Sequence, residues 1–295
     1  MKVLVLFSGG KDSQACLLWA LNEYGVNNIE AVFCDTGWEN PVTYEHIVNT
    51  CKKWNVKLVI LKSKKYDGMI DLAEKKKRFP STKARFCTEE LKSKPAIDYV
   101  LEHKENVIVI EGIRRNESNS RSKMQAECTY FKYYFEPIGK DKKGKDKYHT
   151  YRKKDVIKWC KDWNADKIRP IFNWDATQTI NYIKAAGDIP NPLYYMGFNR
   201  VGCFPCIMSR QGGIKLIIEN HPEQWQALKD AELKVGSTFF PPLYIPRRFQ
   251  TGRTRNGIFI PTAEDVERYI KAKNNTIDMF DQETPSCMSA YNLCE

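Results

Sequence analysis

A glycine-rich turn at residues 7–15, FSGGKDSQA, follows the apolar run at residues 3–6. Two adjacent glycines let backbone N–H groups approach phosphate oxygens closely, and the N-terminus of a following helix adds a favourable dipole. The hydroxyl groups of Ser8 and Ser13 and the positive charge of Lys11 can bind the same phosphates. The turn lacks the Gly-Lys-[Ser/Thr] of the Walker sequence. These residues therefore predict a phosphate-binding loop of another kind.

The chain has 295 residues, a net charge of +11 and a pI near 9.0. Its positive charge is concentrated in lysine and arginine clusters at residues 62–65, 75–78, 140–154 and 247–255. Such patches suit a polyanion, either a nucleic acid or a multiply phosphorylated nucleotide, although a solvated lysine-rich surface explains any single cluster equally well. No apolar run approaches the ~18 residues that span a bilayer. We therefore expect a cytoplasmic protein with no membrane partner.

The sequence contains ten cysteines. Since a reducing cytosol keeps thiols free, metal binding or catalysis is a better interpretation than a disulfide framework. Cys203 and Cys206 form a Cys-x-x-Cys, a spacing that places two thiolates within reach of one metal and that suits zinc, an iron–sulfur cluster or a redox dithiol. Cys287 and Cys294 near the end of the sequence and Cys87 offer further ligands. Four of these thiols can form one site if the tail folds back onto the core.

Strand-like and helix-like segments alternate in the first part of the chain. The short β-branched apolar runs typical of strands buried on both faces of a sheet occur at residues 3–7, 29–34, 57–61 and 107–110. Helical periodicity occurs at residues 12–24, 41–54 and 88–103. This order predicts an α/β fold with a doubly wound parallel sheet.

The later part of the chain has a different character. A long, polar and basic connection at residues 114–154 precedes a strand at 167–172 and a helix at 175–186. The turn-rich, cysteine-bearing residues 191–213 lead into helical stretches near 214–220, 222–234 and 263–273. We predict a nucleotide-binding α/β domain at residues 1–187 and a C-terminal Cys-x-x-Cys segment with a helical extension at residues 188–295.

Five motifs resemble one known family. Ser-Gly-Gly-Lys-Asp-Ser at residues 8–13 resembles the PP-loop of the adenine-nucleotide α-hydrolases, also called N-type ATP pyrophosphatases. Three segments are similar to the phosphoadenosine phosphosulfate (PAPS) reductase branch of that superfamily: Asp-Thr-Gly-Trp-Glu at 35–39, Arg-Phe-Cys at 85–87 with Lys92 and Pro95, and Gly-Ile-Arg at 112–114 with Glu117, Ser118 and Arg121. Residues 191–194 and 200–206 resemble its Pro-x-Tyr…Arg-x-Gly-Cys-x-x-Cys segment.

The resemblance implies a PP-loop ATP pyrophosphatase (HUP-like) core, in which the nucleotide lies across the C-terminal ends of the strands. The residues that it assigns to nucleotide binding are Ser8, Gly9, Gly10, Lys11, Asp12, Ser13, Asp35, Thr36, Gly37, Gly112, Arg114, Glu117 and Ser118. The residues that it assigns to catalysis are Lys11, Asp12, Arg114 and Arg121.

The resemblance also bears on the cysteines. Family members with a [4Fe-4S] cluster use a Cys-Cys pair before the Lys…Pro segment and a later Cys-x-x-Cys. Here Cys87 aligns with the first cysteine of that pair and Thr88 replaces the second, so one ligand is missing. The expected ligands are Cys87, Cys203 and Cys206 with Cys287 or Cys294. The resemblance favours a [4Fe-4S] cluster over Zn²⁺, and the other tail thiol would be a sulfur carrier or nucleophile.

The resemblance leaves the reaction open. Branches that retain the full loop use ATP, which implies ATP with Mg²⁺, cleavage between the α- and β-phosphates, and adenylation of an acceptor. Nucleic-acid thiolation, on tRNA or DNA with a cysteine desulfurase or other sulfur donor as partner, is then the first hypothesis, with the oligomeric state, a dimer included, left open. The alternatives are a thiol-dependent PAPS/APS reductase that releases sulfite and a non-catalytic nucleic-acid-binding module. The aromatic residues at 130–135 suit a nucleic-acid surface or a core.

Overall fold

The computed structural model describes residues 1–254 and 256–274. The chain forms two compact units. The first unit comprises Met1–Cys34, Val42–Leu61 and Ser93–Pro192, and the second comprises Asp35–Pro41, Lys62–Lys92 and the chain from Leu193 onward. The second unit is therefore built from three separate stretches of sequence. The domain boundary between residues 187 and 188 stays a prediction.

The first unit is built on a six-stranded sheet in the order β3-β2-β1-β4-β8-β5. The strands are β1 (Lys2–Leu6), β2 (Ile29–Cys34), β3 (Lys57–Leu61), β4 (Val107–Ile110), β8 (Ala165–Ile168) and β5 (Glu127–Thr129). All neighbouring pairs are parallel except β5 with β8. The predicted doubly wound parallel sheet is confirmed, with an antiparallel edge strand that was not predicted. The strand order reverses at β1, so the crevice between β1 and β4 is a topological switch point where ligands bind in folds of this type.

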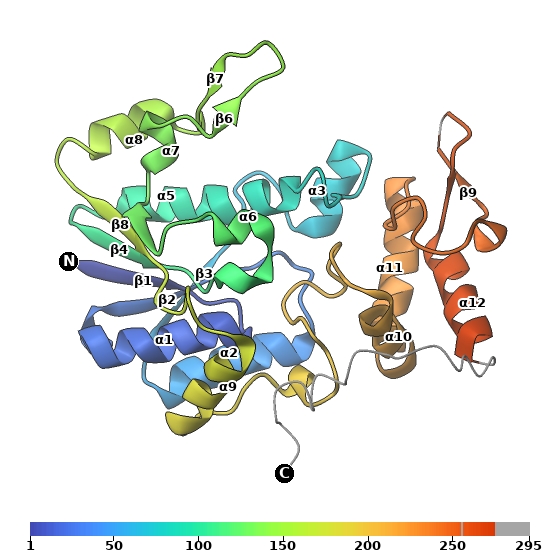
Figure 1. The fold of residues 1–295 in the computed structure, drawn as a ribbon, viewed down its shortest axis with the longest axis horizontal. Helices are drawn as coiled ribbons and strands as arrows, with labels where there is room; N and C mark the ends of the chain where they lie inside the picture. The colour runs from blue at the N-terminus through green and yellow to red at the C-terminus, as the bar shows by residue number, and fades with distance from the viewer. Residues whose placement is uncertain (255, 275–295) are drawn as a thin grey trace. The chain divides into compact units, whose positions relative to one another are not determined.

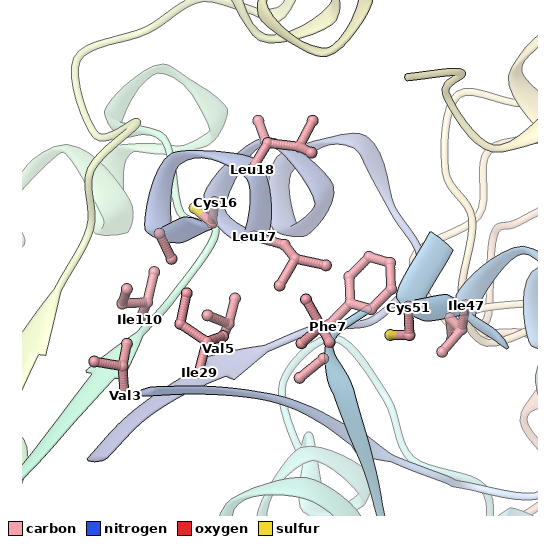
Figure 2. Packing of buried hydrophobic residues seen from close by; sticks show 14 of the residues in the cluster. Val3, Val5, Phe7, Cys16, Leu17, Leu18, Ile29, Ile47, Cys51 and Ile110 are labelled. Atoms are coloured by element: carbon pink, nitrogen blue, oxygen red, sulfur yellow. The ribbon is translucent and has the colours of Figure 1, made fainter. Parts of the chain in front are cut away.

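Helices cover both faces of this sheet (Figure 1). α1 (Lys11–Tyr24), α2 (Pro41–Lys53) and α9 (Ala176–Ala185) lie on one face, and α5 (Lys94–Glu102) and α8 (Lys153–Trp159) lie on the other. Because side chains alternate along a strand, Val3 and Val5 belong to the apolar cluster under α1, whereas Leu4 belongs to the cluster on the opposite face. Figure 2 shows the first cluster, in which Leu17 of α1 lies between the sheet and Leu18. Burial on both faces explains why these strands are continuously apolar.

Three predicted boundaries were wrong or incomplete. The predicted helix at 88–103 consists of a short helix, α4 (Phe86–Thr88), a wide π-helical turn (Glu89–Ser93) and then α5. The strand predicted at 167–172 is β8, which ends at Ile168 because Phe172 N–H bonds back to the Arg169 carbonyl in a turn. The polar connection contains α6 (Asn119–Ser122), β5, α7 (Lys132–Phe135), the hairpin β6 (Gly139–Lys140) and β7 (Asp146–Lys147), and the start of α8.

The second unit is mainly helical. Its helices are α3 (Met69–Lys76), α4, α10 (Gln211–Asn220), α11 (Pro222–Val235) and α12 (Ala263–Asn274), and α11 packs against α3, α10 and α12. A small antiparallel hairpin, β9 (Gly252–Arg253) with β10 (Phe259–Ile260), precedes α12. The predicted C-terminal helices are confirmed. Within the described part of the chain, no helix combines the length and the apolar character needed to span a bilayer.

Candidate functional site

The glycine-rich turn connects β1 to α1 in the first unit. Phe7 is buried, and its N–H donates to the Val32 carbonyl at 2.8 Å, which extends the pairing of β1 with β2. Gly9 has a φ of +73°, and a Cβ on it would lie 2.9 Å from side-chain carbons of Thr43 and Ile47 on α2. Only glycine combines this left-handed conformation with such a close approach. The turn therefore lies tightly against α2 before α1 begins at Lys11.

Two serines shape the inside of the turn. The Ser13 hydroxyl donates to the Gly10 carbonyl at 2.9 Å and accepts a hydrogen bond from the Ser8 N–H at 3.1 Å. The Ser8 and Ser13 hydroxyl oxygens are 3.2 Å apart. Since a serine hydroxyl has a single hydrogen, this arrangement uses the Ser13 donor within the loop. Ser13 therefore holds the loop conformation, and Ser8 is the more exposed of the two hydroxyl groups.

A buried asparagine holds the turn from the other side. Asn191 is fully buried, and its side-chain amide donates to the Gly9 carbonyl at 3.0 Å and lies 3.4 Å from the Thr43 hydroxyl. In a trans peptide the carbonyl and the following N–H point in opposite directions. By fixing the Gly9 carbonyl, Asn191 therefore aims the Gly10 N–H away from itself. Sequence analysis placed Asn191 in a family motif but gave it no role in the loop.

Buried charges gather at the N-terminus of α1. Lys11 and Arg114 are both buried, and both reach the Asp12 carboxylate, with Lys11 Nζ at 3.7 Å and Arg114 Nε at 2.6 Å. Glu117 accepts from the Arg114 backbone N–H and forms a close ion pair with Arg121. Three cations therefore share two carboxylates, which leaves a positive balance where the helix dipole also favours an anion.

The turn after β4 contacts this region directly. A Cβ on Gly112 would lie 2.7 Å from the Asp12 carbonyl carbon and the Ser13 nitrogen, so a side chain there would collide with the backbone of α1. Ser118 accepts from the Arg121 N–H at 3.2 Å and caps α6. The structure thus brings the predicted residues at 8–13 together with Gly112 and Arg114 at the switch point, with Glu117, Ser118 and Arg121 next along the chain.

Two further cations lie at the carboxyl end of β8, the neighbour of β4: Lys167 is within the strand and Arg169 directly follows it. Lys167 and Arg169 both pair with Glu111 at 3.0 Å, and Arg169 is buried. Glu111 directly precedes Gly112. Sequence analysis missed this group, although two basic residues at the carboxyl end of a buried strand were a usable signal.

The second unit contains the cysteine loop. The Phe204 N–H donates to the Trp38 carbonyl at 2.7 Å, and the Trp38 indole N–H donates to the Pro205 carbonyl at 3.1 Å. These bonds join the loop at 203–206 to residues 35–39. The motif residues Asp35, Thr36 and Gly37, predicted to bind nucleotide, therefore lie in the second unit, beside Cys203.

Three polar side chains surround the Cys203 thiol. Its sulfur lies 3.6 Å from Lys92 Nζ, 3.7 Å from a Glu39 carboxylate oxygen and 3.8 Å from the Thr36 hydroxyl. The Thr36 hydroxyl itself donates to Glu39 at 2.7 Å. Glu39 and Lys92 belong to the motifs described above, but sequence analysis assigned neither of them to the thiol.

The thiols of this unit influence one another electrostatically. Burial raises the pKa of Cys203 to about 11, an effect that Lys92 opposes and that Glu39 and Cys206 strengthen. Burial also raises the pKa of Cys87, with Cys206 adding to the increase and Lys92 opposing it. Cys87 and Cys203 are therefore protonated at neutral pH, and a metal would have to displace their protons.

The three thiols are of the kind that binds metals, but the described residues do not form a complete set of metal ligands. Three thiols lie within electrostatic reach of one another in one unit, and thiolate sulfur is the ligand that iron–sulfur clusters and structural zinc use. Across residues 1–254 and 256–274, no three His, Cys, Asp or Glu side chains are placed to hold a metal ion. The other two predicted ligands, Cys287 and Cys294, lie outside the described residues.

The aromatic residues at 130–135 divide between two environments. Phe131 and Tyr134 are buried in the core on the α8 side of the sheet, whereas Tyr133 and Phe135 are 46% and 54% exposed. Both interpretations of this run therefore apply, each to different residues.

A family model described as "Phosphoadenosine phosphosulfate reductase domain" matches residues 2–209. An uncharacterized 37.8 kDa protein of Escherichia phage 186 is 31% identical over 301 residues, which cover 83% of this chain and 80% of that protein. Uncharacterized protein MJ0973 of Methanocaldococcus jannaschii is 29% identical over 230 residues, which cover 78% of this chain but only 47% of that protein. The chain thus spans about half the length of this second relative. Phosphoadenylyl-sulfate (PAPS) reductase of Candida auris, solved as a phosphate complex, aligns with a TM-score of 0.45 and 18% identity over 70% of this chain and 83% of that chain.

Proposed function

Because the chain belongs to the phosphoadenosine phosphosulfate reductase domain family, we propose that it is an enzyme that cleaves ATP between the α- and β-phosphates and adenylates an acceptor for sulfur incorporation. The observation that carries this proposal is the convergence of two buried cations, Lys11 and Arg114, on Asp12 at the N-terminus of α1. Buried positive charge at a helix N-terminus suits a polyphosphate.

Different residues of the chain would bind the phosphates of ATP and stabilise the leaving pyrophosphate. The Gly10 N–H, aimed by Asn191, and the first turn of α1 would bind the β- and γ-phosphates. Lys11 and Arg114 would stabilise the charge that grows on pyrophosphate as it leaves. Arg121 would act through Glu117, which also accepts from the Arg114 backbone. Mg²⁺ would accompany the nucleotide and reduce the charge that these groups must balance.

The acceptor in this proposal is a nucleic acid, tRNA or DNA. An oxygen of the acceptor would attack the α-phosphorus while pyrophosphate leaves, and a sulfur nucleophile from a cysteine desulfurase or other donor would then displace AMP. The support for this step is the full Ser-Gly-Gly-Lys-Asp-Ser loop together with the basic charge of the chain.

In the same proposal the second unit holds a [4Fe-4S] cluster, with Zn²⁺ as the alternative. The ligands would be Cys87, Cys203 and Cys206 with Cys287 or Cys294. The cluster, when bound, would supply a site where sulfur is handled before transfer. Lys92 would balance part of the negative charge of the thiolates, since it donates to Cys203 at 3.6 Å.

A sulfonucleotide reductase is the second candidate function. The matching family model carries that activity in its description, and the same cations would bind the phosphate and sulfate groups of PAPS or APS. In that case a thiol would attack the sulfur, and sulfite would be released after reduction by an external thiol donor.

Product analysis separates these functions. The proposal predicts pyrophosphate from ATP and Mg²⁺ when an acceptor nucleic acid is present, and AMP when a sulfur donor is also added, without ADP. Sulfite released from PAPS or APS with a thiol donor would favour the reductase instead. If neither reaction occurs but nucleic acid binds, the chain is a non-catalytic binding module.

Metal analysis tests the second unit separately. Protein purified without oxygen should contain iron and sulfide, and Cys203→Ala should lose the iron while retaining ATP binding. Cys160→Ala is the matched control, because Cys160 is a partly buried cysteine of the first unit. Stoichiometric zinc without iron would exclude the cluster.

A further inference from the structure

The second unit carries a segment whose charge is entirely positive. Residues 236–262 contain no Asp, Glu or Lys, and their charged side chains are Arg247, Arg248, Arg253 and Arg255. The first three of these arginines are exposed. The segment includes the β9–β10 hairpin, in which Arg253 lies directly opposite Phe259. A local positive charge without any internal carboxylate indicates an anion-binding surface.

Two of these arginines share one aromatic ring. The guanidinium carbons of Arg247 and Arg253 lie 2.9 Å and 3.5 Å from the centre of the Phe259 ring. An aromatic face attracts a guanidinium group and restricts its motion. The two side chains are therefore held in place before any partner binds, which lowers the entropy cost of binding.

Hydrogen bonds attach the β9–β10 hairpin to the rest of the second unit. Asp265 of α12 accepts from the Thr251 N–H and hydroxyl at 2.8 Å and from the Thr262 N–H at 3.0 Å. The buried Gln250 side chain donates to the Ile245 carbonyl at 2.7 Å. The bonds to Asp265 fix both ends of the hairpin to α12, and the Gln250 bond holds the chain that leads into it.

The arginines differ from other cations of the same unit. Lys75 pairs with Asp71 at 2.8 Å, Lys234 with Glu74 at 3.1 Å, and Arg268 with Asp265 at 2.5 Å. Within the described ranges of the chain, no carboxylate forms an ion pair with Arg247 or Arg253. Among the described residues, then, no carboxylate neutralises these two charges.

We propose that Arg247 and Arg253, held by Phe259, form with Arg248 a docking surface for the phosphodiester backbone of a nucleic acid. Guanidinium groups bind phosphate through paired N–H donors and also stack on bases, which lysines do not. The choice of a nucleic acid rests on the proposed function, in which the acceptor is a nucleic acid. The surface would hold that acceptor through its backbone and without reading its sequence.

Binding to a fluorescein-labelled oligonucleotide, without ATP, tests the surface. The double variant R247Q/R253Q should bind single-stranded RNA or DNA about tenfold more weakly, and the slope of log K against log salt should fall by about two. The control K75Q/K234Q removes the same charge from lysines that are already paired, so it should change binding much less. F259L keeps both charges and should weaken binding roughly threefold. Thermal denaturation of each variant checks that it folds.

Three outcomes of the binding experiments would contradict the proposed surface. Equal losses in the two double variants would mean that only net charge matters, and unchanged binding in R247Q/R253Q would place the nucleic acid elsewhere. If R247Q/R253Q loses binding to phosphatidylserine vesicles but not to the oligonucleotide, the surface meets a membrane instead. Pyrophosphate release is scored separately. Wild-type binding without release would contradict only the proposed function, and release with normal binding by R247Q/R253Q would contradict only the surface.

Discussion

The two units build their candidate sites in different ways. In the first unit, the loop at 8–13 is one continuous stretch between β1 and α1, and the turn at Gly112 joins it across the neighbouring strand. In the second unit, Cys203 meets Thr36 and Glu39 from one distant stretch of sequence and Lys92 from another. The candidate phosphate site therefore depends on a local motif, whereas the thiol environment depends on long-range assembly.

This difference predicts that substitutions in one site leave the chemistry of the other intact. The buried cations of the first unit are held by carboxylates of the same unit. The thiols of the second unit are affected by Lys92 and Glu39, also of their own unit. Four substitutions test this separation.

The largest effect is expected for Lys11→Ala. Removal of a buried cation from the phosphate loop should lower the rate of pyrophosphate release by about 10³-fold, as loss of a group that stabilises transition-state charge does in other enzymes. Metal content should not change. Lys57→Ala is the control, since Lys57 is an exposed lysine of the same unit that pairs with Glu30. Unchanged pyrophosphate release would remove Lys11 from the site, and loss of metal would show that the sites are not independent.

Gly112→Ala should act next most strongly. Its Cβ would lie 2.7 Å from the backbone of Asp12 and Ser13, so the loop or the β4 turn must move, at a cost of about 2 kcal/mol in the free energy of unfolding. ATP affinity should fall together with stability. In Gly139→Ala the new Cβ meets nothing within 4 Å, and this variant should behave like wild type. Urea denaturation and equilibrium ATP binding measure both quantities, and equal behaviour of the two variants would contradict the close approach.

The sequence predicted those elements whose cause is local. The apolar runs at 29–34, 57–61 and 107–110 match β2, β3 and β4 residue for residue. Burial on both faces explains the apolar character of β2 and β4, whereas β3 is a partly exposed edge strand. The loop at 8–13 was also predictable, since its glycines, lysine and serines act within a few residues of one another. The family motifs added Gly112 and Arg114.

Features that depend on distant partners were not predictable. β5 has an exposed pattern and exists because Glu127–Thr129 pairs with β8. Helical periodicity does not distinguish the wide turn at Glu89–Ser93 from an ordinary helix. The role of Asn191 arises from a contact 182 positions away, with Gly9. The polar neighbours of Cys203 likewise come together only when the chain folds.

Asn191→Ala tests such a long-range contact. Loss of the hydrogen bond to the Gly9 carbonyl should release the Gly10 N–H and raise the KM for ATP about tenfold with little change in kcat, because a buried carbonyl without its donor costs about 1–3 kcal/mol. Asn191→Asp, which keeps the size but not the donor, should act in the same way. Asn22→Ala, on the exposed face of α1, is the control. A lower melting temperature without a change in KM would reduce Asn191 to a purely structural residue.

The smallest effect concerns how each unit responds to pH. In the second unit, burial raises the pKa of Glu232 to about 7, although its carboxylate accepts from the N–H groups of Phe239 at 2.7 Å and Ala263 at 2.8 Å. In the first unit, burial would raise the pKa of Asp188, but hydrogen bonds from Lys53, Gln14 and Trp54 outweigh it and lower that pKa. The two carboxyl groups therefore give opposite pH dependences.

Because the pKa of Glu232 is higher in the folded than in the unfolded state, this group contributes stability to the second unit at pH values below its unfolded pKa. That contribution is lost as the pH rises through its folded pKa. The free energy of unfolding of this unit should fall by about 2 kcal/mol between about pH 5 and pH 7, because the buried carboxyl group loses its proton over this range. The lowered pKa of Asp188 adds stability at these pH values and loses it only in stronger acid. Glu232→Gln should flatten the pH dependence in denaturant titrations, whereas Glu223→Gln, an exposed position on the same helix, should not. If the wild-type protein instead gains stability across this range, the N–H donors dominate at Glu232, and both units then rely on ionised carboxylates to anchor their loops.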